Sequence, residues 1–141
     1  MAQGAIVSIP DSHKDLLVGR VYPVLVTMMP DGQPQAQVVW ADLDGDHVMI
    51  NTERSRQKSR NMERNPKVTL IWVDPDDPDR FIEIRGVIDS MTDADGVEMI
   101  ERLAQKYDGT AYFGGRVAES LRDVQRRVTV RVRPTRIVTR G

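Results

Sequence analysis

The residues best suited to chemistry in this chain are the basic side chains of residues 51–66, which read NTERSRQKSRNMERNP. Six positive side chains fall between residues 54 and 67, and the only acid in that range is Glu63. They are Arg54, Arg56, Lys58, Arg60, Arg64 and Lys67. The net charge of the whole chain is only −1, so this charge is a local concentration. A helix start combines free N–H groups with a positive dipole end, so a helix here predicts a phosphate-binding site.

Two polar residues end the strand that leads into the basic segment. Residues 47–52 are typical of a strand, and Asn51 and Thr52 place an amide and a hydroxyl beside the expected helix start. Such groups bond phosphate oxygens, so we expect both at the anion. The helix would carry one large apolar residue, Met62, so packing alone does not explain its sequence. A solvated connector rich in surface arginine is the alternative interpretation.

A second predicted strand, residues 35–42, is expected to line a groove next to the predicted phosphate site. A hairpin signal joins it to the strand that ends in the basic segment, so the two run antiparallel. Its middle, Gln37, Val38 and Val39, therefore offers backbone groups to the edge of a flat heterocycle. Trp40 fits a place beside that heterocycle or a plain core position, and the core position is the simpler interpretation.

The rest of the sequence predicts a mainly β protein with few helices. Alternating or β-branched runs indicate six antiparallel strands, at residues 22–29, 35–42, 47–52, 67–73, 80–91 and 127–132. One longer helix is expected between Asp95 and Asp108, where apolar residues follow the helical period, and short helices after Pro10 and over residues 116–123. We therefore expect a β-barrel with flanking helices, formed by a single domain of residues 1–141.

Composition narrows the class of protein further. Cysteine is absent and the only histidines are His13 and His47, so we expect no disulfide, no thiolate catalysis and no metal site. The near-neutral charge argues against nucleic acid as a partner. No apolar run approaches the roughly 18 residues of a membrane span, and residues 1–9 show no secretory signal. We therefore expect a cytoplasmic protein without a membrane partner.

Other motifs that carry chemistry are weak or missing. Gly114 and Gly115 lack the three-glycine spacing of a dinucleotide site, and no G-x-S-x-G nucleophile motif occurs. The acidic residues 74–79 have two prolines and the wrong spacing for a calcium loop. No side chain is marked as a general base, so the catalytic residue stays unknown.

Several segments taken in order resemble a known superfamily. They are TMMPDGQPQAQVVW from Thr27, DGDHVMINT from Asp44 and RQKSRNMERNPKV from Arg56. The chain resembles the pyridoxamine 5′-phosphate oxidase-like superfamily of split β-barrel flavin proteins, and within it the class that uses the deazaflavin coenzyme F420. Later segments agree with that class: DPDDPDRFIEIRG from Asp74, LAQKYDG from Leu103 and RRVTVRVRP from Arg126.

The resemblance implies an FMN-binding-protein-like homodimer with two cofactor sites at the subunit interface. It implies that the cofactor phosphate is held by Thr52, Arg56, Lys58, and Arg60 or Asn61. It implies that the ring system lies against the strand formed by Gln37, Val38, Val39 and Trp40. Tyr112 and Arg126 are the residues expected to reach across from the partner subunit.

The resemblance also implies a reaction. Relatives that oxidise pyridoxamine phosphate carry an arginine and histidine pattern near the C-terminus, and this chain has no histidine after His47. The resemblance therefore favours an F420-dependent reductase, in which reduced deazaflavin gives a hydride to an electron-poor double bond of a small organic acceptor and solvent supplies the proton. Two alternatives stay open: an FMN-binding oxidoreductase or flavin carrier, and a non-catalytic protein that binds F420, haem or another anion.

Overall fold

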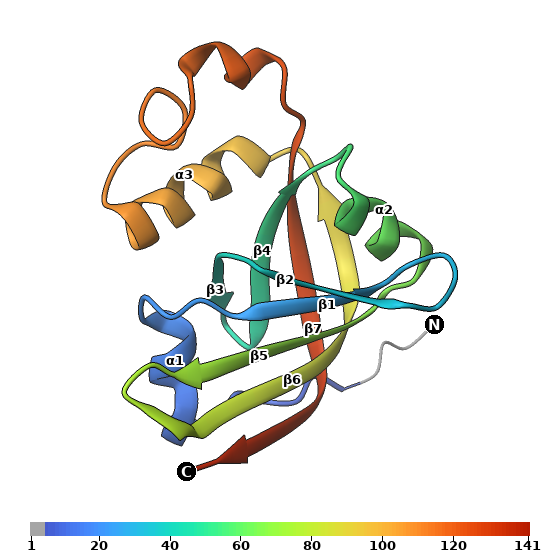
Figure 1. The fold of residues 1–141 in the computed structure, drawn as a ribbon, viewed down its shortest axis with the longest axis vertical. Coiled ribbons are helices and arrows are strands. Elements are labelled where there is room, and N and C mark those ends of the chain that lie inside the picture. The colour runs from blue at the N-terminus through green and yellow to red at the C-terminus, as the bar shows by residue number, and fades with distance from the viewer. Residues whose placement is uncertain (1–4) are drawn as a thin grey trace.

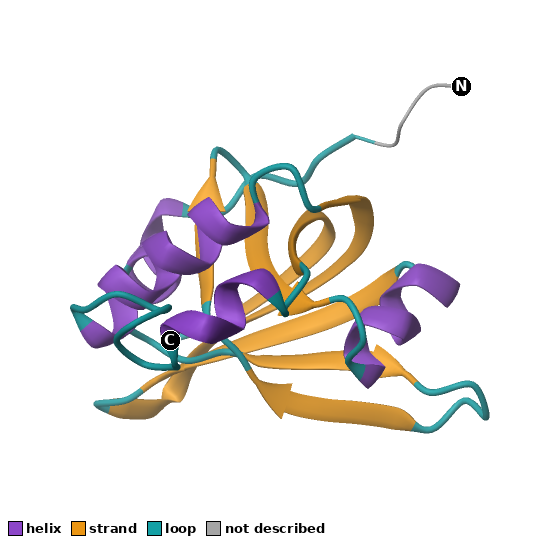
Figure 2. Cartoon of the chain, turned by 90° about the horizontal axis from the view of Figure 1, so that it is seen from above, coloured by secondary structure: helices purple, strands orange, loops and turns teal. Residues whose placement is uncertain are grey.

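The computed structural model describes residues 5–141, and it is mostly β-sheet with helices on the outside (Figures 1 and 2). The strands are β1 (Val24–Met28), β2 (Pro34–Val38), β3 (Ala41–Asp44), β4 (His47–Glu53), β5 (Lys67–Asp74), β6 (Asp77–Thr92) and β7 (Arg127–Arg140). The α-helices are α1 (Lys14–Val18), α2 (Gln57–Arg64) and α3 (Gly96–Asp108), with 3-10 helices at Asp11–His13 and Glu119–Asp123. The predicted mainly β architecture with flanking helices is confirmed. Residues 1–4 lie outside the described residues. They include the first part of residues 1–9, for which the sequence predicted no secretory signal.

The strands pair antiparallel in one sheet, in the order β2-β1-β5-β6-β7-β4-β3. The strands at the two ends of this order, β2 and β3, follow each other in the chain and are joined by Val39 and Trp40. This link carries the chain from one end of the sheet to the other, so the sheet wraps around one core. The Val39–Trp40 link is therefore a corner of the barrel, fixed by a hydrogen bond of 3.0 Å from the Val39 N–H to the Pro23 carbonyl oxygen.

Two strands differ from their predicted ranges. The strand predicted at residues 35–42 is divided by that corner into β2 and β3. The predicted end of the last strand at residue 132 was wrong, because β7 continues to Arg140. A proline normally ends a strand, but Pro134 pairs with Gly86 where the register of the β6–β7 ladder shifts. A Cβ at residue 86 would lie 2.7 Å from the Arg133 carbonyl oxygen, so glycine is needed for this close pairing.

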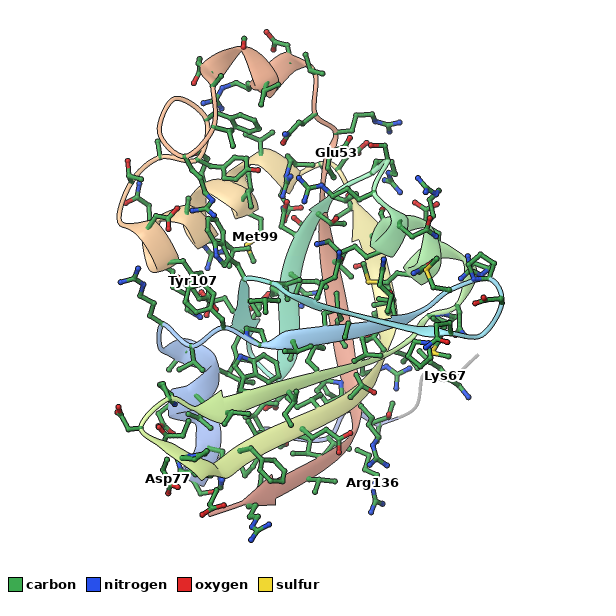
Figure 3. All side chains as sticks on the ribbon, in the orientation of Figure 1. Glu53, Lys67, Asp77, Met99, Tyr107 and Arg136 are labelled. Atoms are coloured by element: carbon green, nitrogen blue, oxygen red, sulfur yellow. The ribbon has the colours of Figure 1, made fainter. Side chains whose placement is uncertain are left out.

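Two apolar clusters fill the molecule. The barrel interior holds the larger one, which includes Trp72, Ile82 and Ile84, all with no exposed surface. The second cluster lies between α3 and the sheet, and Figure 3 shows Met99 and Tyr107 on the side of α3 that faces the strands. The predicted helix between Asp95 and Asp108 is confirmed. No helix among residues 5–141 is long and apolar enough to cross a lipid bilayer.

The N-terminal end of α3 lies against β7. A Cβ at Gly96 would come within 1.9 Å of the Arg127 carbonyl oxygen, so only glycine allows the helix to approach the strand this closely. Tyr107, in the last turn of α3, accepts the Ala41 N–H at 3.2 Å and donates to the Val21 carbonyl oxygen at 2.9 Å. Helix α3 is thus attached at one end to β7 and at the other to the start of β3.

Candidate anion and cofactor site

Helix α2 sits on the barrel through polar side chains as well as one apolar side chain. Met62 is buried, as are Ser59 and Asn61 beside it. The Asn61 Nδ2 donates to the Thr27 Oγ1 at 3.1 Å and to the Gln35 Oε1 at 3.3 Å. This docking explains how a helix without an apolar stripe packs on β1 and β2. Asn61 is thereby committed to the fold.

Three of the six cations of the basic segment are held by other groups of the protein. Arg54 forms an ion pair of 2.8 Å with Glu63, the one acid that the sequence offered between Arg54 and Lys67. Arg60 bonds the Ser55 carbonyl oxygen, and Arg64 bonds the Met28 carbonyl oxygen. These contacts tie the segment to itself and to β1.

Arg56 and Lys58 are different. Arg56 is the residue before the first turn of α2 and Lys58 is its second residue, and no side chain caps this helix start. Within residues 5–141, neither side chain has an ion pair or a hydrogen bond to another side chain. Both line a pocket of about 200 Å³, which we call the basic pocket.

The basic pocket gathers residues from seven parts of the chain. Its lining residues are Val38, Val39, Trp40, Asn51, Arg56, Lys58, Ile100, Tyr112, Arg116 and Arg127. They come from β2, the corner before β3, β4, the start of α2, α3, the loop after α3, and β7. Figure 1 shows α2 and α3 on either side of the upper ends of β4 and β7, where the pocket lies.

The charges in the basic pocket repel one another. Burial lowers the pKa of Lys58, and the nearby positive charges of Arg56 and Arg127 lower it further. Burial also lowers the pKa of Arg127, and Arg56 again adds to this shift. Three cations that raise each other's energy form a site that an anion would stabilise.

Three residues of this pocket were not predicted from the sequence, namely Ile100, Arg116 and Arg127, and Arg127 is the more buried of the two arginines. Its side chain is 5% exposed, and its Nε donates to the Asn51 Oδ1 at 2.9 Å. The alternation of β7 was the available signal: Val130 and Val132 lie in the barrel core, so Arg127 is on the opposite face of the strand, toward α3. In the structure Arg127 is the cross-strand neighbour of Glu53.

Aromatic side chains form another wall of the pocket. The Trp40 ring stacks on Tyr107 with 5.5 Å between centroids, and the Arg116 guanidinium lies 5.0 Å from the Trp40 centroid. Tyr112 meets Trp40 edge-on at 6.3 Å, and its N–H donates to the Glu101 Oε1 at 2.7 Å. Trp40 is half-buried and lines the pocket, so it is not the plain core residue that the sequence favoured.

The free edge of β2 faces away from β1. In this ladder the Val39 N–H bonds the Pro23 carbonyl oxygen, and the pair two residues back is Gln37 with Leu25. Because hydrogen-bonded and non-bonded pairs alternate, the N–H and C=O of Val38 point to the unpaired edge. Val38 is therefore the residue of β2 in this pocket whose backbone can meet the edge of a ring, while Gln37 bonds β1.

The structure brings together seven of the predicted ligand residues and leaves five outside the pocket. Those that line it are Val38, Val39, Trp40, Asn51, Arg56, Lys58 and Tyr112, the last from the same chain as the others. Those outside are Gln37, Thr52, Arg60, Asn61 and Arg126. Thr52 is buried on the face of β4 opposite to Asn51. Arg126 is exposed and pairs with Asp93 at 3.0 Å.

Comparison with known proteins agrees with this fold. A structure named F420 reductase is 32% identical to the chain with a TM-score of 0.80, covering 92% of this chain and 98% of that one. The conserved hypothetical protein Rv2991 from Mycobacterium tuberculosis is 23% identical with a TM-score of 0.72, covering 100% of this chain and 90% of that one. HupZ of Group A Streptococcus is 21% identical with a TM-score of 0.67, covering 93% of each chain. No curated protein matches the chain.

The family itself is shown by the sequence. Residues 9–141 match the family described as pyridoxamine 5′-phosphate oxidase, which is nearly the whole chain. The resemblance seen in the sequence segments is thereby confirmed, and the split-barrel fold agrees with it. This chain belongs to the pyridoxamine 5′-phosphate oxidase family.

Proposed function

We propose that the protein is a reductase that uses coenzyme F420 as its hydride donor. The observation that carries this proposal is the basic pocket, where two uncompensated cations at a helix start lie beside the free edge of a strand. The similarity to the F420 reductase structure supports the choice of cofactor. When bound, the deazaflavin supplies the hydride, and the protein supplies binding and orientation.

The residues of the pocket fit such a cofactor. Arg56 and Lys58 would hold its phosphate, because both are charged and face the pocket without a protein partner among residues 5–141. The Val38 N–H and C=O would bond the polar edge of the ring system. Trp40 and Tyr112 would exclude water from that ring. None of the pocket residues is assigned as a proton donor, and we expect solvent to supply the proton.

We also propose that the protein works as a homodimer whose partner subunit completes each site. The basic pocket holds about 200 Å³, whereas ligand pockets usually hold about 300–1,000 Å³. A groove of about 580 Å³ lies elsewhere, on the outer face of β1, β5, β6 and β7. Val26, Met28 and Val87 line it beside Lys67 and Arg136, so this face offers apolar area for a second copy. Arg126, exposed near the basic pocket, is the residue we expect to reach across.

A flavin is the second candidate cofactor. Four cations line the pocket, Arg56, Lys58, Arg116 and Arg127, and such a set suits the doubly charged phosphate monoester of FMN. The same fold would then serve as an FMN-dependent oxidoreductase or a flavin carrier. A non-catalytic protein that binds F420 or haem would also use this pocket. A cytoplasmic location stays a prediction.

Titration of the purified protein with F420 and, separately, with FMN tests the cofactor. Binding would be followed by fluorescence, and the dimer by light scattering on the same samples. We expect tight, selective binding of F420 to a dimer, followed by oxidation of reduced F420 when an electron-poor alkene is added. Preference for FMN would overturn the cofactor, and F420 binding without turnover on any acceptor would overturn the reductase.

A further inference from the structure

Arg127 is a buried cation whose hydrogen-bond partners are neutral. Its Nε donates to the Asn51 Oδ1 at 2.9 Å, and its Nη1 donates to the Gln125 Oε1 at 3.2 Å. Its guanidinium carbon lies 5.1 Å from the centroid of the Tyr112 ring. No residue among 5–141 forms a salt bridge with it. A buried charge without an opposite charge is costly, so the fold retains this arginine at the expense of stability.

Glu53 compensates the charge of Arg127 only in part, because its carboxylate raises the pKa of Arg127 but does not outweigh the effect of burial. Glu53, the cross-strand neighbour, uses its carboxylate to accept the N–H and hydroxyl of Ser55 and, at 3.2 Å, the N–H of Arg126. The other charged groups that line the pocket are Arg56, Lys58 and Arg116, and all of them are positive. The charge of Arg127 is therefore left largely uncompensated among residues 5–141, and an anionic ligand would supply the missing opposite charge.

Asn51 controls where Arg127 points. Its Nδ2 donates to the Gly96 carbonyl oxygen at 2.8 Å, and its Oδ1 receives the Arg127 Nε. The amide is thus held between the first turn of α3 and the guanidinium, and it is 9% exposed. The sequence predicted that this amide bonds phosphate itself, whereas the structure shows both of its polar ends bonded to the protein.

We propose that Arg127 is a third anion-binding residue of the basic pocket and that Asn51 is a positioning residue that aims it at the ligand's phosphate. The proposal deepens the proposed function, because it names a residue and a charge for the same site. The family resemblance implied a role for Arg126, which is the preceding residue in the chain. The side chain of Arg126 is exposed, whereas that of Arg127 is buried. Three cations would then contact the anion: Arg56 and Lys58 at the start of α2, and Arg127 on β7.

The variant R127M tests the anion-binding role, since methionine has similar length and no charge. We expect the affinity for F420 to fall about 10- to 100-fold, the effect of losing a charge-assisted bond. We also expect the ligand-free protein to melt at a higher temperature, because a buried unpaired charge is gone. The matched control is R131M: Arg131 lies on the same face of β7 but pairs with Asp44 at 2.8 Å, away from the pocket. It should leave the affinity unchanged.

A double-mutant cycle tests the positioning role of Asn51. We expect N51A to weaken F420 binding in the wild-type protein and to have little further effect in R127M, because its role acts through the arginine. A purely structural role would give additive losses and would overturn the positioning proposal. If R127M fails to fold, Q125E replaces it: a carboxylate at that position would neutralise the guanidinium, and we expect the same loss of affinity.

Pyrophosphate as a second probe separates this inference from the choice of cofactor. If F420 does not bind the wild type but pyrophosphate raises its melting temperature more than that of R127M, the cofactor proposal fails and the role of Arg127 stands. If F420 binds wild type and R127M equally, and R127M melts at a lower temperature, Arg127 is a structural residue and the inference is overturned.

Discussion

Arg80 and Arg127 are the same residue type in opposite electrostatic surroundings. Arg80 pairs with Asp15 at 2.6 Å and with Asp74 at 3.0 Å, and these two carboxylates raise its pKa. Arg127 has only neutral partners, and burial lowers its pKa. The Arg80 network joins α1 to the β5–β6 hairpin and is complete within the chain. The basic pocket is incomplete without an anion, so the comparison separates charges that hold the fold from charges that bind a ligand.

Removing Lys58 should give the largest effect in the pocket. We expect K58A to weaken cofactor binding by roughly 1.5–3 kcal/mol, the range for a bond to a charged group. The free energy of unfolding of the ligand-free protein should not fall in parallel, since Arg56 and Arg127 repel this lysine. Fluorescence titration and chemical denaturation of the same samples measure both quantities. Unchanged affinity would mean that Lys58 does not bind the phosphate. A loss of stability as large as the loss of affinity would mean that Lys58, like Arg80, serves the fold.

The pocket should also respond to alkaline pH. The pKa of Lys58 is lowered in the folded protein, so between that lowered pKa and the ordinary value of 10.5 the unfolded chain binds more protons than the native one. The stability of the ligand-free protein therefore gains from Lys58 deprotonation as pH rises through this window. Affinity for the cofactor should fall over the same window, because the lysine loses its charge. Denaturation and cofactor titrations repeated at increasing pH should show stability rising while affinity falls. The K58A variant is the control, because it lacks the lysine and should show neither change.

The Arg80 network should respond to acid instead. The hydrogen bonds that Arg80 donates to Asp15 lower the pKa of this carboxyl group. The pKa of Asp74 is lowered by the hydrogen bond from the Asp76 N–H and by the one from Arg80. The stability from these groups is present above the ordinary pKa of 3.8 and is lost as pH falls through the lowered values. We expect D74N to reduce the melting temperature modestly near neutral pH, with a difference from wild type that vanishes in strong acid. Cofactor affinity at pH 7 should not change, and a loss of affinity would contradict the separation of the two regions.

The sequence identified the elements of this site better than its individual contacts. Charge concentration located Arg56 and Lys58, and the hairpin signal placed the backbone of residues 37–39 near them, because both signals are local. The role of Asn61 was not visible, since its partners on β1 and β2 lie 34 and 26 residues away in the chain, respectively. Arg127 was missed for the same reason: its burial depends on a helix whose start lies 31 positions earlier at Gly96.

Removing Glu63 should have the smallest effect on stability and on cofactor affinity. It pairs with Arg54 at 2.8 Å, but the two side chains are 43% and 29% exposed. Exposed ion pairs contribute about 0–1 kcal/mol, because water and salt screen them. We expect E63A to change the free energy of unfolding by less than about 1 kcal/mol and the cofactor affinity by less than twofold. Because E63A also frees a cation in the basic segment, a clear rise in affinity would mean that Arg54 joins the ligand, and the pocket would then extend beyond Arg56 toward β4.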